Sequence, residues 1–395
     1  MNNFIEFYTK NNISPVSQNI KDLGAHFNRR NSLYRTLGVA PILFKGRDVL
    51  EVAPGSGYNS IVTASYEPNS YDLIEPNPSG YEKMISLFEE YHYKNEKNHF
   101  YNVMLEDFPE ERQYDIVMCE GLLPGLSNPD IFLKQLESKV KSGGILIITC
   151  ADTVSVFFET LRRYLSRIII YNKKKTRGIN NFEAVQAAEL LSEVFQPHLK
   201  SLIGMSRPVE DWIWDNMLNP ASASLAAANE FSIAKAFEYF GDAFYFYASS
   251  PNCMNDYTWY KKLPEETEKY NHPFLDSFLS KQLNFLHYQE TTQPNKSLSE
   301  RLNECCKLFS LQVEQRDALN PGDFSAEIIE ADLKPVHEIK EILGKTELKL
   351  SLTAVTEFLK LFEDGKIPTE KAVSSMQHLS SAFGRGQQYI SFIKK

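Results

Sequence analysis

The sequence predicts an α/β protein whose mostly parallel sheet is covered by helices on both faces. Short apolar segments rich in Val, Ile and Tyr recur between residues 48 and 150, and most of them end in a turn or an acidic residue. Helix-like amphipathic segments, at 79–93 and 128–140, lie between them. Near-continuous apolar strands that alternate with amphipathic helices are typical of parallel sheets buried on both sides.

The strands expected in this region are residues 48–53, 71–76, 100–105, 114–119 and 145–150. The segment Lys-Ser-Gly-Gly before the last of them combines a helix stop with a turn. About forty residues of mixed helical character precede the first strand, and we expect residues 1–44 to form a helical cap.

After residue 150 the pattern changes. Residues 151–235 are predicted to be helical, residues 240–251 form a further strand, and residues 257–263 are its possible partner. From about residue 265 the chain is expected to be largely helical. The predicted domains are therefore the cap at 1–44, a core at 45–265 with a helical substrate-region insertion at about 151–235, and a mainly helical extension at 266–395.

Composition limits the classes of partner. The chain has 395 residues, 43% of them hydrophobic, and a formal net charge of −9. This size predicts more than one structural unit, and the negative charge disfavours non-specific binding to nucleic acid or to a membrane surface. The most basic run, residues 172–177, is short; a solvated loop explains it, although a phosphate-bearing substrate could use it.

The cysteines and the N-terminal segment indicate a cytoplasmic protein. Five cysteines show no metal-type spacing, so no metal is expected, and Cys119 and Cys150 end apolar runs as small buried residues. An odd number of cysteines without a disulfide framework suggests a reducing compartment. The first residues lack the form of a secretory signal, and no apolar segment approaches the ~20 residues of a membrane span.

The segment Asp48–Ser60, DVLEVAPGSGYNS, joins the first strand to a glycine-rich turn. Ligands of open parallel sheets bind beyond the carboxyl ends of the strands, and Gly55 and Gly57 lie at that edge. Glycine permits close approach of the backbone to a ligand and positive φ. The dinucleotide pattern G-x-G-x-x-G, counted from Gly55, would need a third glycine where Ser60 stands.

Acidic residues collect at the same edge of the predicted sheet. Successive strands end at or near Glu51, Glu75, the pair Glu106 and Asp107, and Glu120. Such a collection would repel a pyrophosphate but would suit a ligand with positive charges and hydroxyls. S-adenosylmethionine has a sulfonium, an ammonium and a ribose diol, and it is the cofactor that we expect.

The region from about residue 20 to residue 150 resembles the class I S-adenosylmethionine-dependent methyltransferases. The segments that carry the resemblance are LEVAPGSG, YDLIEPNP, LEDF, YDIVMCEGLLPGL and VKSGGILIIT, in the family's order. The resemblance implies a Rossmann-like seven-stranded, mostly parallel sheet. Ala53 departs from the family, which usually has its first glycine there; alanine is tolerable if φ is negative.

The resemblance also implies roles for residues. Glu75, with Pro76 after it, stands where the family places its ribose-binding acid, and one carboxylate can accept both hydroxyls of a diol. Asp107 or Glu106 would accept from the adenine amino group, with Phe108 near the ring. The remaining cofactor-binding candidates face the methionine end of the cofactor and are Glu51, Ala53, Gly55, Gly57 and Glu120.

The N-terminal cap supplies further candidates. Arg29, Arg30 and Tyr34 could hold the cofactor carboxylate, because arginine pairs bidentately with such groups. Tyr34 is grouped with the cofactor site and the two arginines with the substrate-binding candidates. An exposed helix face is the alternative explanation for all three.

Catalysis on a hydroxyl would gain from a general base. His26 in the cap, His198 after the fifth strand and, if desolvated, Asp215 are the candidates. Trp212, Trp214 and Asn219 mix aromatic surface with polar groups and are the predicted substrate-binding residues, although a core helix would explain the tryptophans equally.

The prediction is therefore a bacterial-type methyltransferase of a small molecule, with a hydroxyl of a sugar or nucleotide-sugar as the first choice. Two alternatives stay open. One is an NAD-dependent oxidoreductase or epimerase, against which Ser60 and the acidic edge argue. The other is a catalytically inactive partner subunit that binds the cofactor. Residues 348–367 have helical apolar spacing that suits a homodimer through the C-terminal helices.

Overall fold

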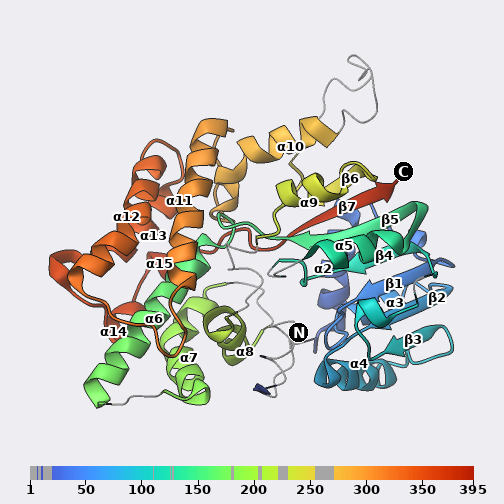
Figure 1. Ribbon diagram of the computed structural model, residues 1–395, viewed down its shortest axis with the longest axis horizontal. Coiled ribbons are helices and arrows are strands. Elements are labelled where there is room, and N and C mark those ends of the chain that lie inside the picture. The colour runs from blue at the N-terminus through green and yellow to red at the C-terminus, as the bar shows by residue number, and fades with distance from the viewer. Residues whose placement is uncertain are drawn as a thin grey trace. The chain divides into compact units, whose positions relative to one another are not determined.

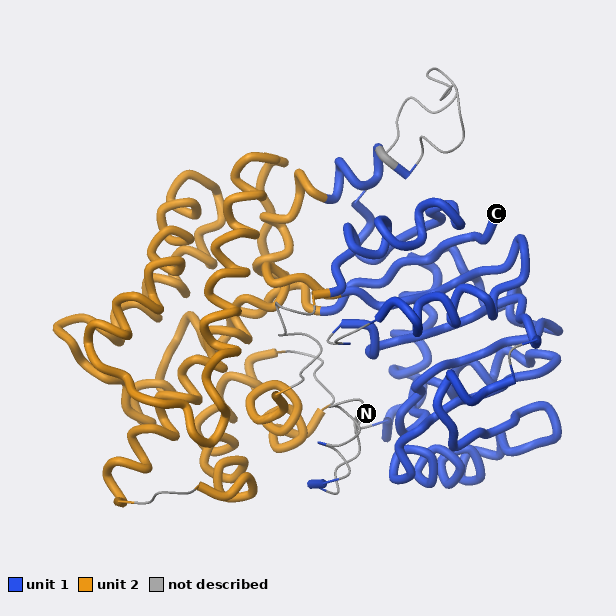
Figure 2. Tube along the Cα trace, in the orientation of Figure 1, with its two compact units in different colours: residues 1–150, 231–278, 387–395 blue, residues 151–230, 279–386 orange. Residues whose placement is uncertain are grey.

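A computed structural model describes residues 7, 10, 11, 20–109, 111–124, 126, 129–178, 182–202, 207–220, 230–253 and 271–395. The chain divides into two compact units (Figures 1 and 2). Unit 1 comprises residues 1–150, 231–278 and 387–395, and unit 2 comprises residues 151–230 and 279–386. Each unit is thus assembled from segments that are distant in the sequence.

Unit 1 contains a seven-stranded sheet, with the order β3-β2-β1-β4-β5-β7-β6. The strands are β1 (Asp48–Val52), β2 (Ser70–Ile74), β3 (Asn98–Tyr101), β4 (Tyr114–Cys119), β5 (Val140–Cys150), β6 (Phe244–Ser250) and β7 (Gln388–Lys394). Strands β1 to β5 pair in parallel, and β7 runs antiparallel to both of its neighbours, β5 and β6. The predicted Rossmann-like, mostly parallel sheet is confirmed.

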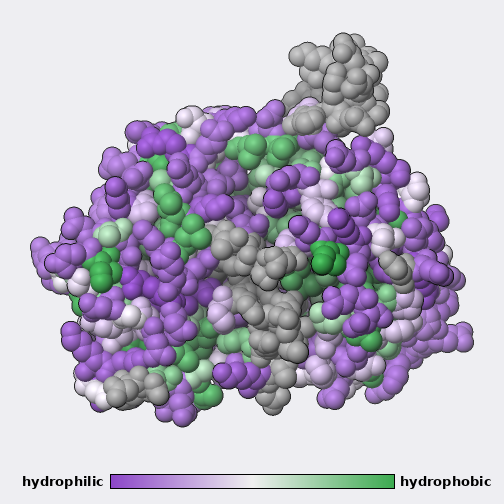
Figure 3. Space-filling view, in the orientation of Figure 1, coloured by the Kyte–Doolittle hydropathy of each residue, from purple (hydrophilic) through white to green (hydrophobic). Residues whose placement is uncertain are grey.

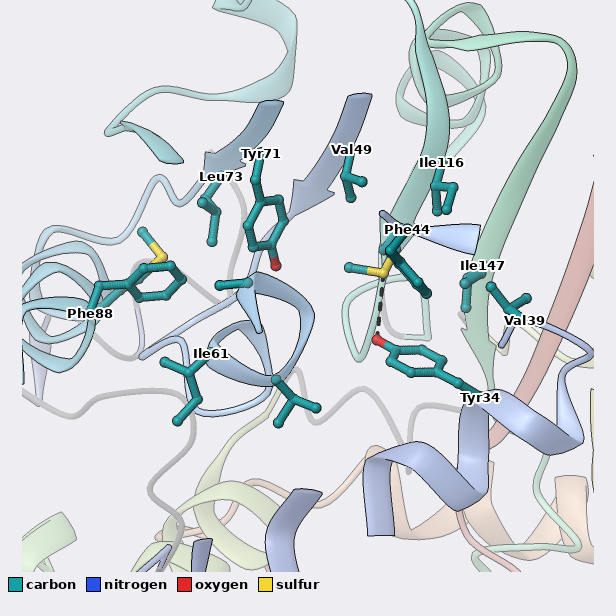
Figure 4. Close-up of a cluster of buried hydrophobic side chains, with 14 of the residues drawn as sticks. Tyr34, Val39, Phe44, Val49, Ile61, Tyr71, Leu73, Phe88, Ile116 and Ile147 are labelled. Atoms are coloured by element: carbon teal, nitrogen blue, oxygen red, sulfur yellow. Dashed lines mark hydrogen bonds between the residues drawn. The ribbon is translucent and has the colours of Figure 1, made fainter. Parts of the chain in front are cut away.

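Burial along the strands explains why both faces of the sheet are covered. Val49, Tyr71 and Ile116 belong to one apolar cluster, drawn in Figure 4. Their neighbours Leu50 and Val117 point to the opposite face, because successive side chains of a strand alternate, and are also fully buried. Near-continuous apolar strands are the result.

Unit 1 also contains helices, which lie around this sheet. They are α2 (Leu23–Thr36), α3 (Ser60–Ala64), α4 (Pro78–Glu90), α5 (Pro129–Ser138) and α9 (Ile233–Phe240), with the short turns η1 (Pro41–Leu43) and η2 (Leu105–Asp107). Helix α4 begins where Asn77 caps its first turn and Pro78 occupies the first position, as helix starts favour. Its buried Met84 and Phe88, four residues apart, form one apolar face.

The last strand differs from its prediction. The described partner of β6 is β7, which lies in the segment predicted to be the mainly helical extension. The predicted partner, residues 257–263, lies outside the described residues. The segment Gln388–Lys394 is rich in β-branched and aromatic residues, which favour strands. The sheet of unit 1 thus includes residues from both ends of the chain.

Unit 2 is helical. Its main helices are α6 (Phe157–Arg177), α7 (Ala184–Lys200), α11 (Lys296–Glu314), α12 (Ala326–Leu343) and α13 (Lys349–Lys360). The shorter ones are α8 (Val209–Ile213), the π-helical η3 (Trp214–Leu218), η7 (Gln282–Phe285), η8 (Glu363–Gly365), α14 (Glu370–Ser374) and α15 (His378–Ser381), and α10 (Asn271–Ser280) spans the boundary at residue 278. Residues 151–230 and 279–386 therefore form one unit, whereas the predicted insertion and extension were separate regions.

Gly384 allows a close backbone approach in the C-terminal region. A Cβ at Gly384 would lie 2.0 Å from the carbonyl oxygen of Ser155, so only glycine fits there. Gly386 has a φ of +64°. Within the described parts of the chain, no helix combines the length and the apolar character that crossing a membrane requires.

Candidate functional site

The turn after β1 has the geometry of a ligand-facing loop. Ala53, Gly55 and Gly57 all have positive φ, at 58°, 61° and 77°. A Cβ on Gly57 would lie 2.8 Å from Cγ of Met84, so this glycine packs against α4. A Cβ on Gly55 would meet nothing within 4 Å. The turn therefore leaves open space at the carboxyl end of β1, where a ligand can lie against the backbone.

Ala53 corrects the expectation of a negative φ. Its φ of 58° lies in the left-handed region, where a Cβ is too close to the following carbonyl oxygen. The backbone amide of Ala53 donates to the carbonyl of Ile74 at 2.8 Å, which ties the end of β1 to the end of β2. The chain thus keeps the backbone conformation that glycine would adopt without strain.

We expect Ala53→Gly to stabilise the protein by about 0.5–1 kcal/mol, because relief of left-handed strain exceeds the added entropy of the unfolded chain. Urea unfolding measures this free energy. The matched control is Ala64→Gly at the end of α3, where φ is not positive and glycine is expected to cost about 1 kcal/mol. Equal effects of the two substitutions would contradict the interpretation.

Glu75 is the acid that the structure holds most firmly at this edge. It follows β2 and is 4% exposed. Its Oε2 accepts from the amide of Gly55 at 2.7 Å and its Oε1 from the amide of Asn77 at 2.8 Å. Burial raises the pKa of Glu75 to about 7, against the two backbone hydrogen bonds, which lower it. The carboxylate thus joins the glycine turn to the start of α4 and keeps further lone pairs for a ligand.

Asn77 adds an unused donor beside Glu75. Its Oδ1 caps α4 by accepting from the amides of Ser79 and Gly80, whereas its Nδ2 is buried without a hydrogen-bond partner. Buried polar groups without a partner are rare and need an explanation. An acceptor on a ligand that also reaches Glu75 would satisfy this amide.

Arg30, Tyr34 and Glu120 form a buried network at the end of β4. Nη2 of Arg30 contacts both carboxylate oxygens of Glu120, at 2.7 and 2.8 Å, and the Tyr34 hydroxyl at 2.7 Å. Figure 4 shows Tyr34 directed at Met118 of the same strand. The predicted ligands of the cofactor's carboxylate and ammonium therefore pair with each other, and Nε of Arg30 stays buried without a partner.

Glu51 lies in β1 and is also buried. Its Oε2 accepts from the hydroxyl of Tyr71, and burial, followed by repulsion from Glu120, raises its pKa to about 7. The charge of Glu120, the partner of Arg30, therefore acts directly on Glu51. Its protonated form is well populated near neutral pH, which reduces the crowding of negative charge at this edge.

The remaining cofactor candidates are more exposed. Glu106 and Asp107 lie in η2 and both face solvent, which leaves their carboxylates accessible. Phe108 is buried with its ring edge-on to Tyr101 at 4.9 Å, so it lies under this segment. Pro76 is half-buried and Arg29 is exposed, on the same helix as Arg30. The adenine-facing role of Glu106, Asp107 and Phe108 stays a prediction.

His26 lies next to the glycine turn. Its Nε2 faces the carbonyl of Tyr58 at 2.7 Å, so this nitrogen carries the proton and Nδ1 is the one able to accept another. Burial is the largest cause that lowers its pKa, which keeps the ring neutral near pH 7. His26 therefore stays a candidate base, and it also fixes the position of the turn.

His198 and Asp215 lie elsewhere, in unit 2. His198 is fully buried; its Nδ1 accepts from Nε of Arg162 and its Nε2 faces the carbonyl of Val373. Burial lowers its pKa to about 3, and both nitrogens are engaged, which corrects its assignment as a base. Asp215 pairs with Arg207 at 2.8 Å, and its side chain is 23% exposed.

The predicted substrate-binding aromatics are core residues. Trp212 and Trp214 are 3% and 7% exposed, and Trp212 packs edge-on against Phe195 in unit 2. Their burial corrects the expectation of an open aromatic surface. Asn219 is also buried, and its carbonyl accepts from Arg163 at 2.7 Å.

Sequence reasoning missed three residues of the site. Tyr71 holds Glu51, Asn77 holds Glu75 and presents an unused amide, and Tyr58 fixes His26. The Asn-Pro pair at 77–78 was a usable signal, because it marks a helix start directly after the acid. Nothing in the local sequence marks the partnership of His26 with Tyr58, since 32 residues separate them.

The sheet and site define an α/β fold that presents a glycine turn and acids at the carboxyl ends of its strands. Residues 25–194 match a family model described as a methyltransferase domain. None of the curated proteins compared with the chain matches it. Residues 25–194 therefore form a methyltransferase domain, and S-adenosylmethionine is the cofactor that such a domain uses.

Solved structures similar to this chain include three with low identity. The [4+2]-cyclase SpnF is 18% identical, with 31% of this chain and 44% of that chain covered and a TM-score of 0.28. An S-adenosylmethionine-dependent methyltransferase from Mesorhizobium loti is 8% identical, with 29% of this chain and 50% of that chain covered and a TM-score of 0.25. The MccD protein is 10% identical, with 56% of this chain and 72% of that chain covered and a TM-score of 0.31. This chain spans about half the length of the first of these structures.

The pKa of Glu75 predicts a pH dependence of cofactor binding. A raised carboxyl pKa means that the folded protein loses stability as pH rises from 4.5 to 7, because the buried group resists ionisation. The ionised form accepts the ribose hydroxyls, so the Kd for S-adenosylmethionine is expected to fall about fivefold to tenfold between pH 6 and pH 8. Titration calorimetry across this range measures it.

The control for this pH dependence is Glu75→Gln. The cofactor's own ammonium titrates in both proteins, so only the difference between them reports Glu75. The variant is expected to show a flatter dependence than the wild type. Parallel curves would contradict the assignment of the titration to Glu75.

Proposed function

We propose that the protein methylates a small molecule with S-adenosylmethionine, and that the acceptor atom is a hydroxyl of a sugar or nucleotide-sugar. The observation that carries the cofactor half is the set Gly55, Glu75 and Asn77: open space over a glycine, a buried carboxylate and a buried amide without a partner. A ribose diol fits the carboxylate, and a neighbouring acceptor fits the amide.

The chain's own residues would bind and orient the reactants. S-adenosylmethionine, when bound, supplies the activated methyl group. Glu75 and Asn77 would hold the ribose, and the unpartnered Nε of Arg30 would donate to the cofactor's carboxylate. His26 would take the hydroxyl proton at Nδ1, because its Nε2 is engaged and its ring is neutral. Orientation of the acceptor in line with the methyl group supplies much of the rate.

The acceptor class rests on sequence grounds. The net charge of −9 disfavours nucleic acid and membrane surfaces as partners. All five cysteines are buried and lie outside disulfide bonds, which suits a reducing compartment such as the cytoplasm. The protein's face in Figure 3 is largely hydrophilic, and Leu308 and Leu350, 49% and 46% exposed, are apolar side chains on the C-terminal helices where a homodimer could form.

A second candidate function is a cofactor-binding subunit without its own catalysis. The observation in its favour is the engagement of two of the three candidate bases, since His198 is buried with both nitrogens bonded and Asp215 is ion-paired. In this function the edge at Glu75 would still bind S-adenosylmethionine. Methyl transfer separates the two candidates.

The test is an assay of methyl transfer. The full chain is incubated with isotope-labelled S-adenosylmethionine and a pool of nucleotide-sugars, and products are identified by mass spectrometry. A labelled methyl group on a sugar hydroxyl, lost in His26→Gln with cofactor binding retained, is the expected result. Cofactor binding without transfer to any sugar would reject this acceptor class and favour the subunit function.

A further inference from the structure

Helix α6 of unit 2 carries three arginines that are almost completely buried. Arg162, Arg163 and Arg167 are 0%, 3% and 1% exposed. Removal of a guanidinium from water costs several kcal/mol, and buried arginines are normally paired with carboxylates. Among the described residues, none of the three forms an ion pair.

Arg162 has an evident structural role. Its Nη2 donates to the carbonyls of Leu379 and Ala382, at 2.5 and 2.7 Å, and its Nε donates to His198 at 3.2 Å. These bonds join α6 to α7 and to the segment after α15. Its guanidinium also lies over the ring of Phe383, 4.1 Å from the centroid. Its Nε and Nη2 are therefore used within the fold, whereas its Nη1 is buried without a partner.

Arg163 and Arg167 are different. Arg163 donates to one carbonyl, that of Asn219, and Arg167 to the carbonyl of Met217 and the hydroxyl of Ser166. The Nε of each is buried and has no partner. Each guanidinium has five donors, so most of the hydrogen-bonding capacity of the pair is unused. Burial lowers the pKa of Arg163 to about 10 and that of Arg167 well below its usual value.

The two arginines lie together. They stand four residues apart on α6, hence on one face, and the charge of Arg163 adds to burial in lowering the pKa of Arg167. Both also reach the same segment, since Met217 and Asn219 lie at the end of η3. Glu314, Asp215 and Asp317 influence them electrostatically but do not pair with them.

We propose that Arg163 and Arg167 form a binding site in unit 2 for the oxyanion of a small molecule, a phosphate or carboxylate group. Two guanidinium groups with free donors on one helix face match the geometry of such anions. An anion between them would neutralise the buried charge and satisfy both Nε groups. The assignment of this anion to the methyl acceptor rests on the proposed function, whereas the binding itself does not.

A nearby cavity is the main rival for an anion. It has a volume of about 510 Å³ and lies at the end of α6, with Tyr171, Lys174, Lys175 and residues 320–322 around it. The basic run noted in the sequence faces it. Its lysines are already engaged, because Lys174 donates to Asn320 and Lys175 lies 5.7 Å from the ring centroid of Tyr171. Arg163 and Arg167, in contrast, each have a buried nitrogen without a hydrogen-bond partner.

Thermal unfolding of the full chain tests the proposal. The probes are sodium phosphate and sodium acetate, each compared with sodium chloride at equal ionic strength. The wild type is expected to show a saturable rise of Tm with one of the two oxyanions, because binding to the folded state stabilises it. Phosphate alone would identify a phosphate site, and acetate alone a carboxylate site.

Variants locate the site. Arg163→Lys and Arg167→Lys keep the charge but lose the forked donors, so the half-saturating concentration is expected to rise at least tenfold. Arg163→Met and Arg167→Met are expected to abolish the response, with Tm in chloride not greatly lowered, because each removes an unpaired buried charge. Arg316→Met is the matched control: this arginine has a carboxylate, Asp332, at 2.6 Å, so its loss is expected to lower Tm and to leave the oxyanion response intact.

Two outcomes would overturn the proposal. One is a wild type whose Tm depends only on ionic strength, with no difference among the three salts. The other is an oxyanion response that persists in both lysine variants but is lost in Lys174→Gln or Lys175→Gln, which would assign the anion to the cavity. Neither outcome bears on methyl transfer, so the failure of this site and the failure of the proposed function can be distinguished.

Discussion

Glu120→Leu is expected to destabilise the protein by about 3 kcal/mol, because it leaves the Arg30 guanidinium buried without its anion. Both side chains are less than a tenth exposed, and one nitrogen of Arg30 contacts both oxygens of Glu120. Tyr34, the other partner of Arg30, has a hydroxyl whose pKa is raised well above its usual value by burial, so it cannot replace the carboxylate as an anion. Urea unfolding measures the loss.

The reverse single substitution is expected to be costly for a second reason. Arg30→Met leaves Glu120 beside Glu51, whose pKa burial and Glu120 already raise. Two acids in one buried place cannot both ionise without repulsion, so we expect a loss of about 2–3 kcal/mol at pH 8 and a smaller loss at pH 5. The pH difference separates the charge effect from lost packing.

The double variant Arg30→Met/Glu120→Leu completes a cycle. Because an apolar pair of similar volume can replace a buried ion pair at small cost, we expect it to be more stable than either single variant. A coupling energy of at least about 1.5 kcal/mol is then expected, which is well above the error for additive sites. Additive losses, or single variants within about 0.5 kcal/mol of the wild type, would mean that the pair does not stabilise unit 1.

The sheet of unit 1 was predictable because its signals are local. Most strands from Asp48 to Cys150 are near-continuous apolar runs, and the helices between them carry their own apolar stripes. Strand β7 was not predicted because it is the last segment of the chain and follows a long helical region. Only its antiparallel pairing with β5 and β6, far away in the sequence, makes it part of the sheet.

The sequence predicts where the acidic residues of the site lie, but not which residues they pair with. Acids at strand ends follow from the sequence, because the carboxyl ends of parallel strands meet at one edge. The contact between Arg30 and Glu120 joins residues 90 positions apart, and no local pattern encodes it. At Ala53 the local preference of alanine predicts the wrong backbone conformation, because the turn imposes a positive φ that alanine disfavours.

Unit 2 shows why a sequence reading of aromatic residues is ambiguous. Trp212 and Trp214 have the spacing and polar neighbours of a substrate surface, yet packing against residues such as Phe195 buries them. Large aromatic side chains contribute so much apolar area that a core position is their usual place. The arginines of α6, which the sequence presents as an ordinary amphipathic helix, are the residues whose burial is unusual.

Glu75→Ala is expected to weaken the binding of S-adenosylmethionine at least tenfold, which corresponds to about 1.4 kcal/mol. The wild-type carboxylate is pre-positioned by the amides of Gly55 and Asn77, so it can accept two ribose hydroxyls without further ordering. Titration calorimetry of the full chain at pH 8, where the acid is mostly ionised, measures the loss.

A structural effect must be separated from loss of the ribose contact, because alanine also leaves two backbone amides without their acceptor. A cofactor analogue that lacks the ribose 2′-hydroxyl serves this purpose. We expect the wild type to bind this analogue several-fold more weakly than it binds the cofactor. We expect Glu75→Ala to bind the analogue and the cofactor equally well, because this variant already lacks the contact. Glu82→Ala, an exposed acid on α4, is the control for charge alone and is expected to bind as the wild type does. If the analogue loses the same factor in both proteins, Glu75 shapes the turn and does not contact the ribose.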